Sequence, residues 1–221
     1  MISLKDMCQC IGRNVSGEVS VIHDFFGFWN GSSPSEVSVM TQIQRLQGKH
    51  VHANFITVGT FSNADMLEID QALVAMRNLY APVNLGVGRI EWYGISAAEA
   101  AGRDNIGSDS EAEALTDEWT VHNSALDIFF VLTYAGSTIG LSRVDGPCDK
   151  DAKGMDGSVV AIEGSANTTG YVLAHEAGHY LGLSHVNDGN NLMNPSVPNG
   201  GALSSGQGGN MRNHCFVKSA C

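Results

Sequence analysis

The sequence predicts an α/β domain. Between residues 49 and 164, apolar runs of strand length alternate with a helical pattern and with polar turns, as expected for layered α/β folds. At 221 residues and 43% hydrophobic content, the chain is long enough for one packed unit with a sizeable core. Beyond residue 167 the pattern changes to a histidine-rich segment, so the chemistry is expected near the C-terminal end.

The elements of this domain can be assigned in chain order. Four runs rich in apolar, β-branched and aromatic residues are predicted as strands: 51–60, 87–95, 126–134 and 158–162. Ser62 with Asp65 forms a capping-box pattern, and the apolar residues that follow it lie on one helical face until Pro82. The acidic stretch 97–123 is predicted to hold a surface loop and a short helix.

The charge of the chain limits its partners. Lys and Arg number 12 against 23 Asp and Glu, which gives a net charge of -11. This field repels phosphate groups, so nucleic acid and anionic membrane surfaces are disfavoured and neutral or basic polypeptides fit better. No run approaches the roughly 20 apolar residues that span a bilayer. We expect a secreted or extracytoplasmic monomer whose leader is not part of this sequence, with a cytoplasmic location as the alternative.

The cysteines allow limited cross-linking. Their number is odd and too small for a disulfide scaffold. They are Cys8, Cys10, Cys148, Cys215 and Cys221. One or two bridges with a free thiol fit this count.

Two histidines beyond residue 167 have the spacing of metal ligands. Asn167 or Thr168 can cap a helix over the segment that follows, which places His175 and His179 four residues apart on one helical face. Glu176 lies one position round, with its carboxylate beside an ion held by the pair. A catalytic zinc ion takes three protein ligands and leaves a fourth position open, so a further ligand is required.

His185 is the candidate for the third ligand. Gly182 tolerates the positive φ that ends a helix and turns the chain back. The complete pattern, HExxHxxGxxH, arises by chance in roughly one chain in ten thousand of this histidine content. The alternative is that these histidines are ordinary residues of an amphipathic helix, or that the chain is a pseudoenzyme.

The segment HEAGHYLGLSH resembles the zinc-binding consensus of the metzincin metallopeptidases. Downstream, Asn191-Leu192-Met193-Asn194-Pro195 resembles the Met-turn of that clan, which implies that Met193 supports the histidines from below and is not a ligand. The proline two residues after the methionine, at a place without a tyrosine, is similar to matrixins. Val186 after the third histidine matches none of the common families, so the narrower assignment stays open.

The resemblance implies a zincin-like catalytic domain with a twisted mixed sheet, an active-site helix and a small C-terminal lobe. Residues 49–221 would form this domain, with the lobes divided near residue 185, and residues 1–48 an N-terminal extension or pro-segment. Residues 138–144 would form the antiparallel edge strand that holds substrate, with Ile139, Gly140 and Leu141 as contacts. The alternative for this segment is an ordinary loop. Leu203 to Gln207 resembles the start of a C-terminal helix.

These patterns predict a zinc-dependent endopeptidase. One Zn²⁺ ion would activate water, and Glu176 would act as general base and then donate the proton to the leaving amine. The alternatives are a catalytically silent zinc-binding module and a zinc hydrolase of a non-peptide amide. Asp149, Asp151 and Gly154 resemble the start of a calcium loop, although Lys153 occupies a ligand position. An acidic turn is the simpler interpretation, with a structural Ca²⁺ site as the alternative.

Overall fold

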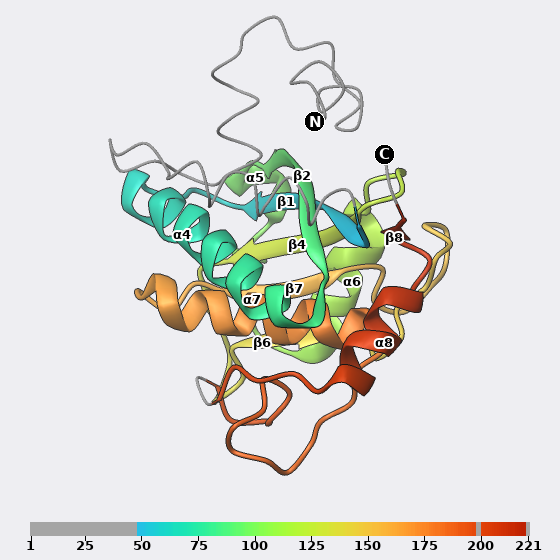
Figure 1. The fold of residues 1–221 in the computed structure, drawn as a ribbon. Helices are drawn as coiled ribbons and strands as arrows, with labels where there is room; N and C mark the ends of the chain where they lie inside the picture. Colours follow the sequence, from blue (N-terminus) through green and yellow to red (C-terminus); the bar gives the residue numbers. More distant parts are fainter. Residues whose placement is uncertain (1–47, 198–199, 220–221) are drawn as a thin grey trace, which may run out of the picture.

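The computed structural model describes residues 48–197 and 200–219. A six-stranded sheet has the order β2-β1-β4-β7-β6, with β8 pairing β1. Its strands are β1 His50–Val58, β2 Gly86–Ile95, β4 Leu126–Val131, β6 Gly140–Ser142, β7 Ser158–Ala161 and β8 Val217–Lys218. β1, β2, β4 and β7 are parallel, whereas β6 runs antiparallel to β7 at one edge and β8 antiparallel to β1. The α/β class is confirmed, and the sheet is twisted and mostly parallel (Figure 1).

Helices cover both faces of the sheet (Figure 1). α4 Asn63–Tyr80 and α7 Ala166–Tyr180 pack together on one face, and α6 Asp109–Trp119 packs on the other. The alternation of strand side chains explains the two cores: Phe55 joins the α4/α7 core and Ile56 the α6 core. β1 is buried on both faces although it carries polar residues, and its buried His50 and Asn54 side chains are hydrogen-bonded to the carbonyl of Gly48 and to Asp127.

The capping-box prediction for α4 is confirmed. The Ser62 side chain accepts a hydrogen bond from the amide of Asp65, and the Asp65 carboxylate accepts one from the amide of Ser62. The helix ends in the 3-10 turn η1 Ala81–Val83, because Pro82 cannot continue the helical hydrogen bonds. None of the helices in the described ranges is long and apolar enough to cross a membrane.

Two predicted boundaries differ from the structure. The acidic stretch contains two helices, α5 Ala97–Ala100 and α6, with the short strand β3 Asn105–Ile106 between them. The predicted strand 126–134 is divided, because β5 Thr133–Tyr134 leaves the main sheet to pair with β3. Hydrophobic periodicity follows burial, and burial does not distinguish one sheet from the next.

The C-terminal segment is attached to the rest of the domain by several contacts. α8 Ser205–Asn213 begins with a capping box between Ser204 and Gln207, which confirms the predicted helix start. Cys148 and Cys215 form a disulfide. Cys8, Cys10 and Cys221 lie outside the described residues.

A buried ion pair lies two residues beyond Cys148 in the chain. The Lys150 ammonium lies 2.8 Å from the carboxylate of Asp127, which also accepts hydrogen bonds from Asn54, Thr120 and the amide of Val121. Breaking one partner of such a pair leaves an uncompensated buried charge. Asp156 is nearby and only 1% exposed, and its Oδ1 has no hydrogen-bond partner among the described residues.

Asp156 is expected to make stability depend on pH. Burial and the charge of Asp117 raise the pKa of Asp156 from 3.8 to about 6. Because the pKa of Asp156 is higher in the folded than in the unfolded state, this group contributes most to the free energy of unfolding at low pH. The contribution is lost as the pH rises through 6. The comparison is the free energy of unfolding of Asp156→Asn minus that of the unmodified protein. We expect this difference to become smaller by about 2 kcal/mol when the pH is lowered from 7.5 to 4.5.

Urea unfolding at a series of pH values measures this difference. A difference that stays constant across the range would show that Asp156 titrates normally in the folded protein. Because the comparison is made at each pH, a fixed cost of burying the asparagine amide does not affect the result.

Candidate active site

Helix α7 begins earlier than expected. The N-cap is Ser165, without a side-chain hydrogen bond, so the prediction of Asn167 or Thr168 as the cap was wrong. The first turn is instead held by Thr169, which donates to the Glu68 carboxylate and accepts from the amide of Glu163. A tertiary contact therefore replaces the local cap.

A glycine lets α7 approach α4 closely. A Cβ built on Gly170 would lie 2.5 Å from the Cβ of Ala75 and 3.1 Å from the carbonyl oxygen of Ala72. Tyr80 of α4 donates a 2.7 Å hydrogen bond to the carbonyl of Ala174, one residue before the first histidine. These contacts fix the position of the histidine-bearing turns against the core.

The structure brings the three predicted histidines together. The Nε2 atoms of His175 and His179 lie 3.0 Å apart, and each lies 3.0–3.1 Å from the Nε2 of His185. Four ligands at the Zn–N distance of about 2.0 Å in a tetrahedron lie roughly 3.3 Å from one another, close to this spacing. His175 and His179 are buried and His185 is exposed, so the group opens to solvent on one side.

Backbone carbonyls determine which ring nitrogens face each other. Nδ1 of His175 donates to the carbonyl of Leu192 at 2.7 Å, and Nδ1 of His179 donates to that of Leu183 at 2.7 Å. A carbonyl can only accept, so both Nε2 atoms carry lone pairs that point at one another. Such an arrangement repels unless a cation lies between the nitrogens, and it is typical of imidazoles oriented for a metal.

Burial keeps these imidazoles in the neutral form that a metal requires. Desolvation lowers the pKa of His175, and it lowers the pKa of His179 to about 4. The donor set of three imidazole nitrogens with one open side fits a catalytic Zn²⁺ ion. The residues present therefore fit the metal that the sequence motif predicts.

Gly182 turns the chain after α7 as expected. Its φ is +95°, a conformation that favours glycine, and its amide donates to the carbonyl of His179. The amide of Leu183 then donates to the carbonyl of Gly178. The reversal returns the chain so that His185 reaches the other two histidines.

Met193 is fully buried against the underside of α7. A Cβ built on Gly178 would lie 2.9 Å from its Sδ, so the helix carries a glycine where the methionine packs. The amide of Val186 donates to the carbonyl of Met193, and the amide of Met193 donates to the side chain of Asn191. The turn therefore packs under the helix and also supplies the carbonyl of Leu192.

Glu176 lies between the helix and the edge strand β6. Its side chain is 7% exposed, and burial raises its pKa to about 8. A Cβ built on Gly140 would lie 2.7 Å from the Cγ and 2.9 Å from the Oε1 of Glu176. Leu141 follows in β6, and the carbonyl of Ile139 accepts a hydrogen bond from Ala161. The predicted antiparallel edge strand is present, while its contacts with substrate stay a prediction.

The close approach of Gly140 gives a testable consequence. In Gly140→Ala the new methyl group occupies the space of the Glu176 side chain, so the carboxylate must move while the histidines keep their positions. We expect turnover to fall by at least roughly 10-fold, since a displacement of about 1 Å can cost 10²-fold. Steady-state kinetics and metal content measure this.

Gly94→Ala is the matched control. Gly94 also lies in a strand, but a Cβ there would be 3.6 Å from the nearest atom, the Oγ1 of Thr57, which is an ordinary contact. Equal activity of the two variants would contradict the steric role of Gly140.

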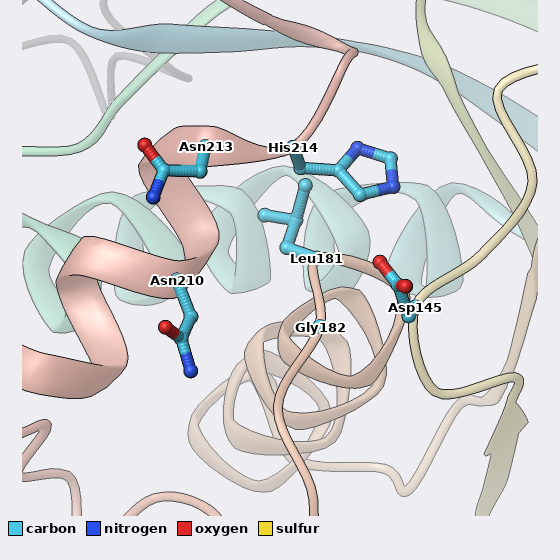
Figure 2. Close-up of a pocket in the computed structure, with 6 residues that line it drawn as sticks. All are labelled: Asp145, Leu181, Gly182, Asn210, Asn213 and His214. Carbon is cyan, nitrogen blue, oxygen red and sulfur yellow. The ribbon is translucent and has the colours of Figure 1, made fainter.

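A separate pocket lies at the end of α7. It has a volume of about 310 Å³ and is lined by Asp145, Leu181, Gly182, Asn210, Asn213 and His214. Figure 2 shows side chains from the C-terminal helix on one side of the pocket and Asp145 on the other. Neither Glu176 nor the histidine group lines it, so this pocket is not the candidate active site.

Within residues 48–197 and 200–219, two groups of side chains have three or more metal-binding atoms in reach of one ion. One is the histidine group described above, and the other is Cys148, His214 and Cys215. Asp149 and Asp151 belong to neither group, and the Asp149 carboxylate accepts a hydrogen bond from the amide of Asp151. The calcium hypothesis is therefore unsupported, and the segment is an acidic turn.

The fold and the histidine group define the class of the protein as a metallopeptidase. A sequence profile described as Metallo-peptidase family M12B Reprolysin-like matches residues 35–212. The chain therefore belongs to the reprolysin-like metallopeptidase family. The similarity to matrixins that the Met-turn proline suggested is not confirmed as the narrower family.

A similar fold is found in a solved metalloproteinase structure. The crystal structure of metalloproteinase-II from Bacteroides fragilis has a TM-score of 0.53 and 16% sequence identity, covering 96% of this chain and 61% of that chain. This chain thus spans 61% of the length of that protein, and at this identity the likeness concerns the fold. A search of curated proteins finds no match.

Sequence reasoning missed the residues that orient the histidines. Leu183 and Leu192 act through main-chain carbonyls, which no side-chain pattern reveals. The sequence pattern assigned Asn191 only to a turn. In the structure, its side-chain amide forms two reciprocal hydrogen bonds with the side-chain amide of Gln207 in α8. The NLMNP pattern located this turn, while its hydrogen bonds required the folded chain.

Proposed function

We propose that this protein is a zinc-dependent endopeptidase. The observation that carries the proposal is the convergence of three imidazole Nε2 atoms, with the buried carboxylate of Glu176, the residue after His175, packed against the edge strand β6. The family supports peptidase activity and a zinc cofactor. The protein's own residues supply the ligands, a proton carrier and a site for an extended chain.

His175, His179 and His185 would hold the metal. Zinc bound there would supply a Lewis acid for the scissile carbonyl and lower the pKa of a water molecule toward neutrality. Met193 would support the histidines from below without contacting substrate. The exposed side at His185 would leave the fourth position open.

Glu176 would accept the proton from the attacking water and deliver it to the leaving amine. Burial favours its protonated form, and a cation next to it would favour the carboxylate, so its proton affinity would lie in the range that a proton carrier needs. A peptide could pair with β6, since Gly140 and Leu141 lie on the edge strand. An extended polypeptide is the substrate that this geometry fits.

The disulfide supports a location outside the cytoplasm. Cys148–Cys215 joins two exposed cysteines, and such bonds persist in oxidising compartments. We infer a secreted or extracytoplasmic protein.

The proposal is tested with a proteome-derived peptide library digested with and without a chelator and read by mass spectrometry. Internal cuts that disappear with chelator and return with Zn²⁺ are expected. Zinc-loaded protein that makes no cuts would contradict the proposal and favour a silent binding module. Cleavage confined to non-peptide amides in a parallel assay would favour the other alternative.

A further inference from the structure

The segment around the disulfide has features of a metal site that the proposed function does not use. Cys148, His214 and Cys215 place one sulfur or nitrogen atom each within 4.8 Å of one another. Nδ1 of His214 lies 3.7 Å from Sγ of Cys215. In a tetrahedral zinc site, sulfur and nitrogen ligands lie roughly 3.5 Å apart, so the imidazole already stands at ligand distance from one sulfur.

The tautomer of His214 leaves a lone pair on Nδ1, the ring nitrogen that lies 3.7 Å from Sγ of Cys215. Its Nε2 lies 3.0 Å from the carbonyl oxygen of Gly146, which can only accept, so Nε2 carries the proton. The amide of Phe216 donates to Nδ1 at 3.3 Å, so the Nδ1 lone pair accepts this hydrogen bond in the oxidised protein and must give it up to bind a cation. A carbonyl that holds one ring nitrogen while the other faces the ligand is the arrangement found in metal sites and in the histidine group of this protein.

The first cysteine is held in place without the disulfide. The amide of Gly146 donates to the carbonyl of Tyr180, and the Tyr180 hydroxyl donates to the carbonyl of Pro147. On the other side of Cys148, Lys150 is tied to the buried Asp127 carboxylate.

The second cysteine is held equally well. Val217 pairs with Val51 of β1, and the amide of Val217 donates to the carbonyl of His214. Phe216 is buried, and the Lys150 ammonium lies 5.0 Å from the centre of its ring. Both cysteines therefore stay adjacent when the bond between them is cleaved.

We propose that reduction of the Cys148–Cys215 disulfide opens a second metal site, in which both thiolates and Nδ1 of His214 bind a thiophilic divalent cation such as Zn²⁺. A dithiol reductant supplies two electrons and two protons, its own sulfurs form a disulfide, and the protein bond becomes two thiols. The cation then displaces both thiol protons to solvent. Both cysteines are exposed, so reductant and cation can reach them, and water completes the coordination.

The consequence is an exchange of one cross-link for another. In the oxidised protein, the S–S bond joins the loop between β6 and β7 to the segment that follows α8. In the reduced protein, the cation joins the same two segments through the same sulfurs. The C-terminal segment would thus remain attached to the domain in either redox state.

The test uses Co²⁺ as the probe on the full chain with Cys8, Cys10 and Cys221 replaced by serine. A thiolate bound to Co²⁺ gives a charge-transfer absorption that the histidine group cannot give, because it has no sulfur ligand. This signal is independent of peptidase activity and of metal at the histidine group, so failure here is distinguishable from failure of the proposed function. Protein reduced with a phosphine is compared anaerobically with oxidised protein.

We expect the reduced protein to bind one more equivalent of metal than the oxidised protein and to show the charge-transfer band. Cys215→Ser should abolish the band, and His214→Gln should weaken binding at this site by at least roughly 10-fold. Reduced protein that binds no additional metal would overturn the proposal.

His214→Gln also serves as the control for folding. Metal captured by two thiolates of an unfolded chain would not depend on His214, so a band of unchanged affinity in this variant would also overturn the proposal. Far-ultraviolet circular dichroism of each reduced sample shows whether the fold is retained. Trapping free thiols over time gives a second measure, since bound Zn²⁺ should slow the return of the disulfide.

Discussion

Replacing Glu176 with glutamine is expected to reduce peptide hydrolysis by roughly 10²–10⁴-fold while zinc remains bound, because general acid–base catalysis contributes about this much. Glutamine keeps the shape of the side chain in the narrow space beside Gly140. It cannot accept the proton of the attacking water. The histidines and their carbonyl partners are unchanged, so the metal affinity should be retained.

Metal analysis and kcat/KM measured on the same sample separate the two effects. Glu163→Gln is the matched control, since Glu163 is exposed and lies before α7; its activity should equal that of the unmodified protein. Undiminished hydrolysis in Glu176→Gln would refute the assignment of Glu176 as the proton carrier. Loss of zinc in that variant would show instead that the carboxylate helps to hold the ion.

Replacing His179 with alanine is expected to remove both zinc and turnover. The Nε2 atom of His179 lies 3.0 Å from each of the other two Nε2 atoms. Its loss leaves two imidazoles, one of them exposed, and two ligands are fewer than the three of catalytic zinc sites. Activity should fall to the level of the chelated protein.

Thermal unfolding with and without Zn²⁺ tests this prediction independently of activity. A ligand at 100 times its Kd stabilises the native state by about 2.7 kcal/mol, so zinc should raise the Tm of the unmodified protein and leave that of His179→Ala unchanged. His122→Ala is the control because the side chain of His122 is 65% exposed and lies outside the histidine group. Stoichiometric zinc in His179→Ala would disprove the ligand assignment.

The chain's local patterns were sufficient for several features of the fold and the site. The capping box at Ser62, three of the four strand runs and the turn at Gly182 depend on residues within a few positions of one another. The spacing of His175 and His179 places both on one helical face by helix geometry alone. These predictions held because short-range hydrogen bonds and side-chain periodicity govern them.

The fold alone decided the features that depend on distant segments. Ser165 replaced the expected caps because the first turn of α7 is held by Glu68 of α4. The division of the strand after Val131 reflects pairing with β3. The family assignment also required more than the local motif, since Val186 and the proline after Met193 did not separate the alternatives.

The sequence by itself determined the candidate site residues: three histidines, one glutamate and one methionine. Only the tertiary structure decided how they are aimed. The carbonyls of Leu183 and Leu192 orient the imidazoles, and Gly140 makes room for Glu176. The physical reason is that every residue has a main-chain carbonyl, and the space beside a glycine depends on distant segments. Residue types alone therefore do not reveal which carbonyl orients a histidine or which glycine leaves room for a side chain.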